Sequence, residues 1–206
     1  MNITALEALE RLRQGNARFA AGQGSMDAME SRARRAELVA GQQPFAIVLG
    51  CSDSRVPAEL VFDQGLGDLF VIRVAGNIVA PSQVGSVEFA AERFGTRLVV
   101  VLGHARCGAI LATLEVLLRP DHEPSRGLRS IVDRIRPSVE SLLSAGLHRE
   151  VDALVDEAVR ANVRASVSQL RHGSESLEAM IERDGLMIVG AEYSLETGRV
   201  DYLDGP

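Results

Sequence analysis

Two short segments of the chain contain side chains that could bind a metal ion. The first is CSDSR, which begins at Cys51, and the second is GHARCG, which contains His104 and Cys107. Two cysteine thiolates and one imidazole are a familiar ligand set for catalytic zinc, and they leave one position of a tetrahedral ion open. If the two segments meet in the fold, the chain has the ligands for a zinc site that activates water.

The same residues allow structural interpretations. Two cysteines are too few for the disulfide framework of a secreted protein, and their number alone favours plain buried thiols, with a disulfide or a metal pair as alternatives. In that case His104 would only bond a carbonyl group. A reactive thiol is a further possibility, with Arg55 lowering the pKa of Cys51. A reactive thiol predicts an anion-binding environment, however, and the first segment places the carboxylate of Asp53 there instead.

Asp53 and Arg55 make the first segment more specific than a metal motif. A carboxylate two residues from a zinc ligand can fill the open metal position, or it can turn to a guanidinium, whose paired N–H groups match its two oxygens. The same carboxylate can thus close or open the metal site. The alternative is an ion pair that only fixes the loop.

Each of the two segments directly follows a continuous apolar run. FAIVLG (45–50) precedes Cys51, and RLVVVLG (97–103) precedes His104; LFVIRV (69–74) is similar. Such runs are typical of parallel strands buried on both faces. Ligands bind beyond the carboxyl ends of such strands, so Cys51, His104 and Cys107 can meet if 45–50 and 97–103 are neighbours.

Helical patterns separate these apolar runs. The first helix is expected over 4–21, with Thr4 and Glu7 as a capping box. Further helices are expected over 27–40, from Pro81 to Gly95, and two or three over 108–183, the longest over about 147–170. LMIVGAEYSL and RVDYL then predict a closing hairpin. This alternation predicts an α/β fold, with a mainly parallel β-sheet, flanking helices and a C-terminal antiparallel addition.

Size and charge exclude several classes of protein. A chain of 206 residues is long enough for one substantial core, so a single domain over 1–206 is expected. The net charge of −6 argues against a nucleic-acid partner. No apolar run is long enough to span a membrane, and the first residues mix acids and bases where a signal peptide needs an apolar stretch. A cytoplasmic location is therefore expected.

The two segments and their flanks resemble the β-class carbonic anhydrases. The similarity lies in CSDSRV and GHARCGA, and it extends to GNARF, PAELVFDQGLGDLFVIRVAGN, VEFAAERFG and YSLETGRV. The resemblance implies one Zn²⁺ per chain, bound by Cys51, His104 and Cys107, with Asp53 as an alternative fourth ligand and with Asp53 and Arg55 as the catalytic dyad. The implied activity is the reversible hydration of carbon dioxide to bicarbonate and a proton, by attack of zinc-bound hydroxide.

The resemblance also implies an assembly and a substrate cleft. The fold would form a homo-oligomer, a dimer or a tetramer, through an N-terminal helical arm of about residues 1–40 and the sheet edges. The cleft would lie at the dimer interface, with Gln42, Phe70, Phe89 and Gly108 as substrate-binding positions. Phe89 is often tyrosine in plant-like members of the family, so this chain lacks one hydroxyl group there.

One subtype of the family binds a regulatory bicarbonate with a tryptophan, an arginine and a tyrosine. The last two match Arg73 and Tyr193, but the tryptophan position holds Val48. The chain is therefore expected to belong to the subtype without this regulation, with structural roles for Arg73 and Tyr193. Two alternative functions remain. The chain could be a hydrolase of carbon disulfide or carbonyl sulfide at the same metal, or an inactive zinc-binding structural or regulatory protein.

Overall fold

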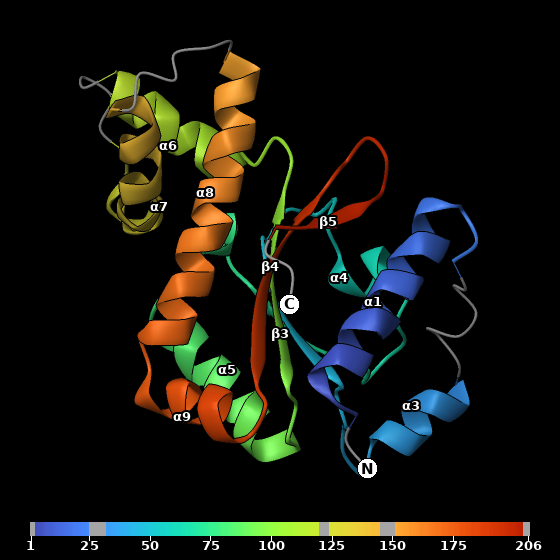
Figure 1. Cartoon of the computed structure of the whole chain (residues 1–206). Helices are drawn as coiled ribbons and strands as arrows, with labels where there is room; N and C mark the ends of the chain where they lie inside the picture. Colours follow the sequence, from blue (N-terminus) through green and yellow to red (C-terminus); the bar gives the residue numbers. More distant parts are fainter. Residues whose placement is uncertain (1–2, 25–31, 120–123, 145–150, 204–206) are drawn as a thin grey trace.

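The protein is built around one five-stranded β-sheet. The computed structural model describes residues 3–24, 32–119, 124–144 and 151–203 (Figure 1). The strands are arranged in the order β2-β1-β3-β4-β5. Their bounds are Leu69–Arg73 (β2), Ala46–Gly50 (β1), Leu98–His104 (β3), Met187–Tyr193 (β4) and Val200–Tyr202 (β5). The first four are parallel and β5 is antiparallel to β4, which confirms the predicted fold class.

The register of the sheet brings the two candidate segments together. Strands β1 and β3 are neighbours, and Gly50 lies opposite Leu102. Cys51 follows Gly50 directly, and His104 is the last residue of β3. Both segments therefore leave the sheet at the same edge and at nearly the same level.

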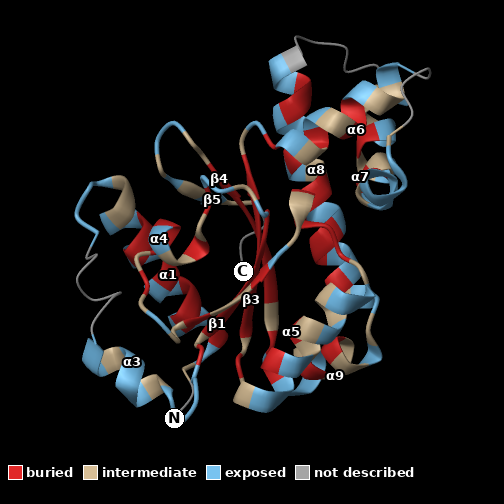
Figure 2. Ribbon diagram, turned by 180° about the vertical axis from the view of Figure 1, so that it is seen from behind, coloured by how far each residue is buried: buried red, intermediate tan, exposed pale blue. Residues whose placement is uncertain are grey.

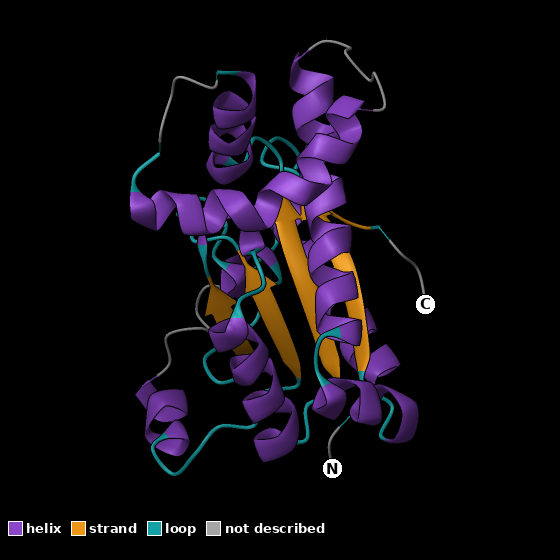
Figure 3. Cartoon of the chain, turned by 90° about the vertical axis from the view of Figure 1, so that its left-hand side faces the viewer, coloured by secondary structure: helices purple, strands orange, loops and turns teal. Residues whose placement is uncertain are grey.

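The two faces of the sheet pack against different helices. Because side chains alternate along a strand, Val48 and Val100 face the cluster that includes α1 (Ala5–Ala20) and α4 (Ala58–Val61). Ile47 and Val99 face the opposite cluster. That second cluster contains residues of α5 (Pro81–Phe94), α8 (Val151–His172) and α9 (Glu175–Arg183). Helices thus cover both faces, and the central strands are buried (Figures 2 and 3).

A third cluster lies beyond the carboxyl ends of the strands. It joins Cys51 and Cys107 to apolar residues of α6 (Gly108–Leu118), α7 (Arg126–Ser144) and the first half of α8. Figure 1 shows α6 and α7 beside the upper half of α8, at this end of the sheet. The two cysteines are therefore enclosed by aliphatic side chains rather than open to solvent.

Most predicted helices are present, with shifted bounds. The capping box is confirmed, since the Thr4 hydroxyl accepts from the Glu7 N–H and the Glu7 carboxylate accepts from the Thr4 N–H. Gly95 ends α5 in a left-handed conformation with φ of 66°. The helix predicted over 27–40 appears as α3 (Arg32–Leu38); residues 27–31 lie outside the described part of the chain.

The region 108–183 contains four helices in its described residues, rather than two or three. Ser174 separates the last two, because its hydroxyl accepts from the Leu177 N–H and starts α9 directly after α8. The start predicted for the longest helix, near residue 147, lies outside the described residues. Within the described residues, no helix has the length and apolar character needed to cross a bilayer.

Candidate metal centre

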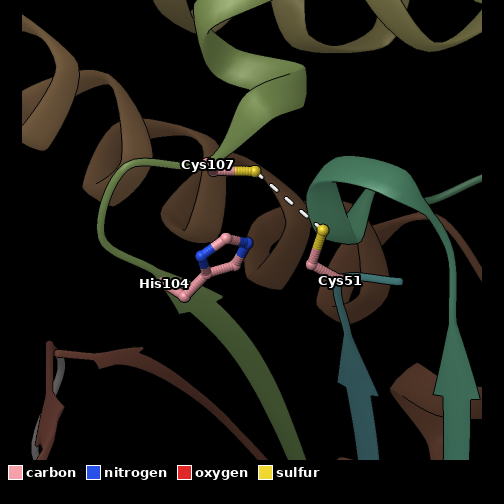
Figure 4. Close-up of side chains that lie close together, drawn as sticks. All are labelled: Cys51, His104 and Cys107. Carbon is pink, nitrogen blue, oxygen red and sulfur yellow. Dashed lines mark hydrogen bonds between the residues drawn. The ribbon is translucent and has the colours of Figure 1, made fainter. Parts of the chain in front are cut away.

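Three side chains converge at the carboxyl edge of the sheet. Cys51 follows β1, His104 ends β3, and Cys107 is the residue before the first turn of α6. Their ligand atoms all lie within 4.8 Å of one another, and all three residues are buried. Figure 4 shows the two sulfur atoms and the imidazole ring pointing toward one space.

The hydrogen bonding of His104 leaves one ring nitrogen free to bind a metal. Nδ1 lies 3.0 Å from the carbonyl oxygen of Ala105. A carbonyl can only accept a hydrogen bond, so Nδ1 carries the proton and Nε2 keeps its lone pair. Nε2 is buried and has no hydrogen-bond partner among the described residues. A buried polar atom without a partner is costly, and a metal ion bound to Nε2 would remove that cost.

The distance between the two sulfur atoms also fits zinc. Cys51 Sγ and Cys107 Sγ are 4.0 Å apart, and both thiols are free. A disulfide needs about 2.05 Å, whereas two sulfurs at about 2.3 Å from a tetrahedral zinc ion lie about 3.8 Å apart. The structure therefore excludes a disulfide here, and the donor set fits zinc.

The two thiols have opposite pKa shifts because they share a proton. The hydrogen bond between the two sulfurs lowers the pKa of Cys51, and backbone N–H groups act in the same direction. The same contact with Cys51, together with burial, raises the pKa of Cys107. Cys51 therefore loses its proton more readily than Cys107, and the thiolate is the form that binds metals.

The backbone between His104 and Cys107 is shaped to bring both side chains to the same space. Arg106 has a φ of 54°, in the left-handed region that residues other than glycine seldom adopt. The Ala105 N–H donates to the Tyr193 carbonyl, which ties this turn to the end of β4. Cys107 then lies at the N-terminus of α6, where the helix dipole favours a negatively charged sulfur.

Asp53 is held by Arg55 and lies beside the ligand set. Arg55 Nε is 2.9 Å from Asp53 Oδ1, and Arg55 Nη2 is 2.7 Å from Oδ2. This pair of hydrogen bonds is the main reason why the pKa of Asp53 is lowered well below its usual range. Asp53 Oδ2 is 3.8 Å from His104 Nε2. The carboxylate is therefore ionised, turned to Arg55, and close to the space that the three ligands share.

Arg73 fixes the loop that contains Cys51 and Asp53. Its Nε donates to the Cys51 carbonyl at 3.1 Å, and its Nη2 donates to the Asp53 carbonyl at 2.6 Å. Tyr193 is buried, and its ring packs against Phe19. These contacts agree with the structural roles expected for Arg73 and Tyr193.

The predicted cleft residues do not converge on the metal ligands within one chain. Phe70 pairs with Ile47 in the sheet, four positions before Cys51, which corresponds to roughly 13 Å along the strand. Gln42 is exposed and precedes β1, at the opposite end of the strand from Cys51. Phe89 is 53% exposed on α5, and its ring lies 6.2 Å from that of Phe70. Gly108 alone is adjacent to a ligand, at the first position of α6.

A pocket of 630 Å³ opens beside the Asp53–Arg55 pair. Arg55, Ala105 and Arg106 line it on the side of the metal ligands. Charged residues of α8 and β4, including Arg160 and Glu192, line the other side. Because both acidic and basic side chains line it, the pocket suits water better than an apolar gas.

Sequence reasoning missed one contact to the ligands. The Gly76 N–H, in the short helix η1 (Ala75–Asn77), donates to Cys51 Sγ at 3.3 Å. Two buried polar residues of α8, Asn162 and Ser166, bond the carbonyls of this segment. Their signal in the sequence is the spacing of four positions, which places both polar side chains on the apolar stripe of α8.

Known proteins that resemble this chain are carbonic anhydrases. Residues 46–200 match the family model for carbonic anhydrase. A carbonic anhydrase of Mycolicibacterium smegmatis is 42% identical over 200 residues, which cover 97% of this chain and 94% of that protein. Carbonic anhydrase 2 of Mycobacterium tuberculosis is 40% identical, over 96% of this chain and 92% of that protein.

Solved structures of the β-class share the fold. The β-carbonic anhydrase CcaA superposes with a TM-score of 0.74 at 28% identity, over 97% of this chain and 93% of that one. The β-carbonic anhydrase of Coccomyxa, solved with acetazolamide, also has a TM-score of 0.74, at 26% identity, over 97% of this chain and 86% of that one. From its sequence, its fold and its Cys-His-Cys centre, this chain belongs to the carbonic anhydrase family, in the β-class.

Proposed function

We propose that the protein catalyses the reversible hydration of carbon dioxide to bicarbonate and a proton, with one zinc ion held by Cys51, His104 and Cys107. The observation that carries the proposal is the meeting of three buried ligand atoms within 4.8 Å, one of them the unpartnered Nε2 of His104. Three protein ligands leave one tetrahedral position for water or substrate. A purely structural zinc site would be expected to have four protein ligands.

The bound zinc would supply the acidity that turns a water molecule into a nucleophile near neutral pH. The protein's own residues would orient that water. Asp53 is ionised beside the ligand set and can accept a hydrogen bond from the water that attacks carbon dioxide. Arg55 would keep the carboxylate in this position and away from the fourth ligand place. The charged pocket beside Arg55 offers a path for bicarbonate and the proton to reach solvent.

We further propose that the substrate cleft forms between two copies of the chain. Gln42, Phe70 and Phe89 lie too far from Cys51 to line a cleft around it in one chain. Phe70, Phe89 and Phe94 instead make an aromatic cluster, in which Phe89 is largely exposed. A homodimer that uses this cluster and the N-terminal arm would bring these side chains to the partner's metal. One structural neighbour, a β-carbonic anhydrase of Sordaria macrospora, is described as tetrameric.

The same proposal places the enzyme in the cytoplasm. Its two free cysteines are 4.0 Å apart and must both stay reduced to bind zinc. Cytosolic thiol systems keep such cysteines reduced.

The proposal is tested by stopped-flow hydration of carbon dioxide on protein of known zinc content. We expect about one zinc per chain, and we expect Cys107→Ser to lose both metal and activity. Full hydration activity in zinc-free wild-type protein would contradict the proposal. Zinc-loaded protein that turns over carbon disulfide or carbonyl sulfide, but not carbon dioxide, would show the rival hydrolase. Zinc-loaded protein without any turnover would show an inactive zinc-binding protein.

A further inference from the structure

Two polar side chains interrupt the apolar face of α8. Asn162 is 2% exposed and Ser166 is 4% exposed, and their neighbours Val163 and Val167 belong to the core. Burying a polar group is unfavourable unless it is hydrogen-bonded. Both side chains therefore need partners in the interior, and these partners indicate what the residues do.

The partners are two successive carbonyls of η1. Asn162 Nδ2 donates to the Gly76 carbonyl at 2.8 Å, and Ser166 Oγ donates to the Asn77 carbonyl at 3.1 Å. Residues four apart on a helix lie on the same face, so one side of α8 holds both carbonyls. The peptide segment that they hold is in the left-handed region, which glycine adopts readily at Gly76 with a φ of 71° but which is unfavourable at Asn77 with a φ of 43°.

The conformation of η1 directs one N–H group at a metal ligand. The Gly76 N–H donates to Cys51 Sγ at 3.3 Å. A side chain at position 76 is unfavourable, because φ is 71° and a Cβ there would lie 2.8 Å from Ile135 Cδ1 and 3.0 Å from Ala109 Cβ. The backbone is thus the only donor that this position can offer to the sulfur.

Helix α8 also packs against β3, the strand that ends at His104. A Cβ on Gly103 would lie 2.5 Å from Val163 Cγ2 and 3.3 Å from Val159 Cγ1, so the close approach of helix and strand requires glycine there. Gly103 immediately precedes His104. Helix α8 therefore contacts both the backbone beside His104 and η1, whose Gly76 N–H donates to Cys51.

We infer that Asn162 and Ser166 are positioning residues for the metal centre, which hold η1 so that the Gly76 N–H donates to the Cys51 sulfur. The inference rests on the proposed zinc site. A hydrogen bond to a metal-bound thiolate reduces the electron density that the sulfur gives to the metal, as outer contacts of metal ligands generally do. Asn162 and Ser166 would thus fix the position of Cys51. Through the Gly76 N–H bond to its sulfur, they would also affect the acidity of the metal.

The test compares Asn162→Leu and Ser166→Ala with the wild type. Asn162→Leu removes the amide and keeps a similar volume; Ser166→Ala removes only the hydroxyl. We expect each to weaken zinc binding by about 10- to 100-fold in chelator competition, because the loss of a fixed Cys51 position outweighs the stronger donation of its sulfur. In cobalt-substituted protein, the sulfur-to-cobalt charge-transfer band should move to longer wavelength, because the sulfur becomes a stronger donor. In metal-free protein, the Gly76 amide should exchange its hydrogen faster.

Two further variants separate positioning from general stability. Ser166→Thr keeps a hydroxyl and should restore the cobalt band and the zinc affinity. Thr96→Val removes another buried hydroxyl that bonds a carbonyl, that of Pro44 at 2.8 Å, at the opposite end of the strands. It should lower the melting temperature comparably while keeping the wild-type cobalt band and zinc affinity. If Asn162→Leu does not fold, the two variants of Ser166 decide the question.

The results that would overturn the inference are specific. If Asn162→Leu and Ser166→Ala lose stability but keep the zinc affinity, cobalt band and Gly76 exchange of the wild type, the pair only packs α8 and the inference is wrong. A wild-type protein that binds no zinc would instead contradict the proposed function, and the inference would fail with it.

Discussion

Arg55 holds both carboxylate oxygens of Asp53, at 2.9 Å through Nε and at 2.7 Å through Nη2. The backbone N–H of Arg55 adds a third bond, to Oδ1 at 3.0 Å. The Asp53 side chain is 17% exposed and that of Arg55 is 52% exposed, so the pair lies at the mouth of the site rather than inside it. With Asp53 held by Arg55, a metal bound by Cys51, His104 and Cys107 would keep its fourth position free of the carboxylate.

The first prediction concerns the loss of this guanidinium. Arg55→Ala removes two of the three bonds that turn Asp53 from the ligand set, and Oδ2 is only 3.8 Å from His104 Nε2. We expect Asp53 to become a fourth zinc ligand, and hydration activity to fall by about 10- to 100-fold with the zinc retained. A crystal structure and stopped-flow rates check this. Arg55→Lys keeps the charge without the planar fork, and should be intermediate.

A different result for Arg55→Ala would contradict this prediction. Near-normal turnover, with Asp53 still away from the metal, would show that the pair only fastens the loop. Asp53 would then have no switching role.

The second prediction follows from the lowered pKa of Asp53. The hydrogen bonds from Arg55 are its main cause, and burial opposes it in part. A carboxyl group with a folded-state pKa below its unfolded value stabilises the folded state above the unfolded pKa, and this contribution is lost as pH falls toward the folded value. The stability difference between wild type and Asp53→Asn should therefore be constant from neutral pH to about pH 5 and shrink below about pH 4.

Urea unfolding of metal-free protein at a series of pH values measures that difference. A difference that already declines between about pH 7 and pH 5 would mean that Asp53 titrates in that range, against its pairing with Arg55. Since Asp53 stays ionised, we assign any loss of hydration activity toward mildly acidic pH to the nucleophilic water or to the metal ligands.

The third prediction is that bicarbonate does not inhibit cooperatively. Val48 stands where the regulated subtype has tryptophan, and both donor groups of Arg73 named above already bind backbone carbonyls. Tyr193 is 5% exposed and packs in the core. Initial rates over a bicarbonate series should give hyperbolic inhibition. A sigmoidal curve would show that Arg73 and Tyr193 can bind the anion without the tryptophan.

The metal ligands were predictable from sequence because each depends on local signals. Cys51 and His104 each follow an apolar run long enough to define a buried strand, and two parallel strands that are neighbours must end at the same edge. The bonds from Asn162 and Ser166 were not predictable, because they join residues 86 and 89 positions away along the chain. They depend on how α8 crosses the sheet, and that crossing is fixed by contacts such as Val163 on Gly103.

The predicted cleft residues show a second limit of prediction from sequence. Phe70 and Phe89 were predicted as cleft positions from the family resemblance alone, since their spacing carries no signal for a metal site. Within one chain they lie together on an aromatic cluster away from Cys51. Their predicted role depends on a second copy, and sedimentation of the protein with Phe89→Asp would test whether this surface forms a dimer.

The last prediction concerns Tyr202, at the end of β5. Within the described part of the chain, its hydroxyl is buried without a hydrogen-bond partner. The Arg13 guanidinium lies over its ring, 5.0 Å from the centroid. Because phenylalanine keeps the ring contact and removes the unpaired hydroxyl, we expect Tyr202→Phe to leave stability unchanged or to raise it by about 1 kcal/mol. Tyr193→Phe is the control, since its hydroxyl is not among the buried unpaired atoms.

The alkaline side of the stability profile provides a second measure of the same residue. Burial raises the pKa of Tyr202 well above its usual value, so the unfolded chain loses this proton at lower pH than the folded one. Wild-type stability should then fall as pH rises past about 10, and Tyr202→Phe should fall less steeply. Urea unfolding of the wild type and Tyr202→Phe near neutral pH and near pH 11 measures the two effects together. A loss of more than about 1 kcal/mol in Tyr202→Phe at neutral pH would mean that the hydroxyl has a partner, such as a buried water.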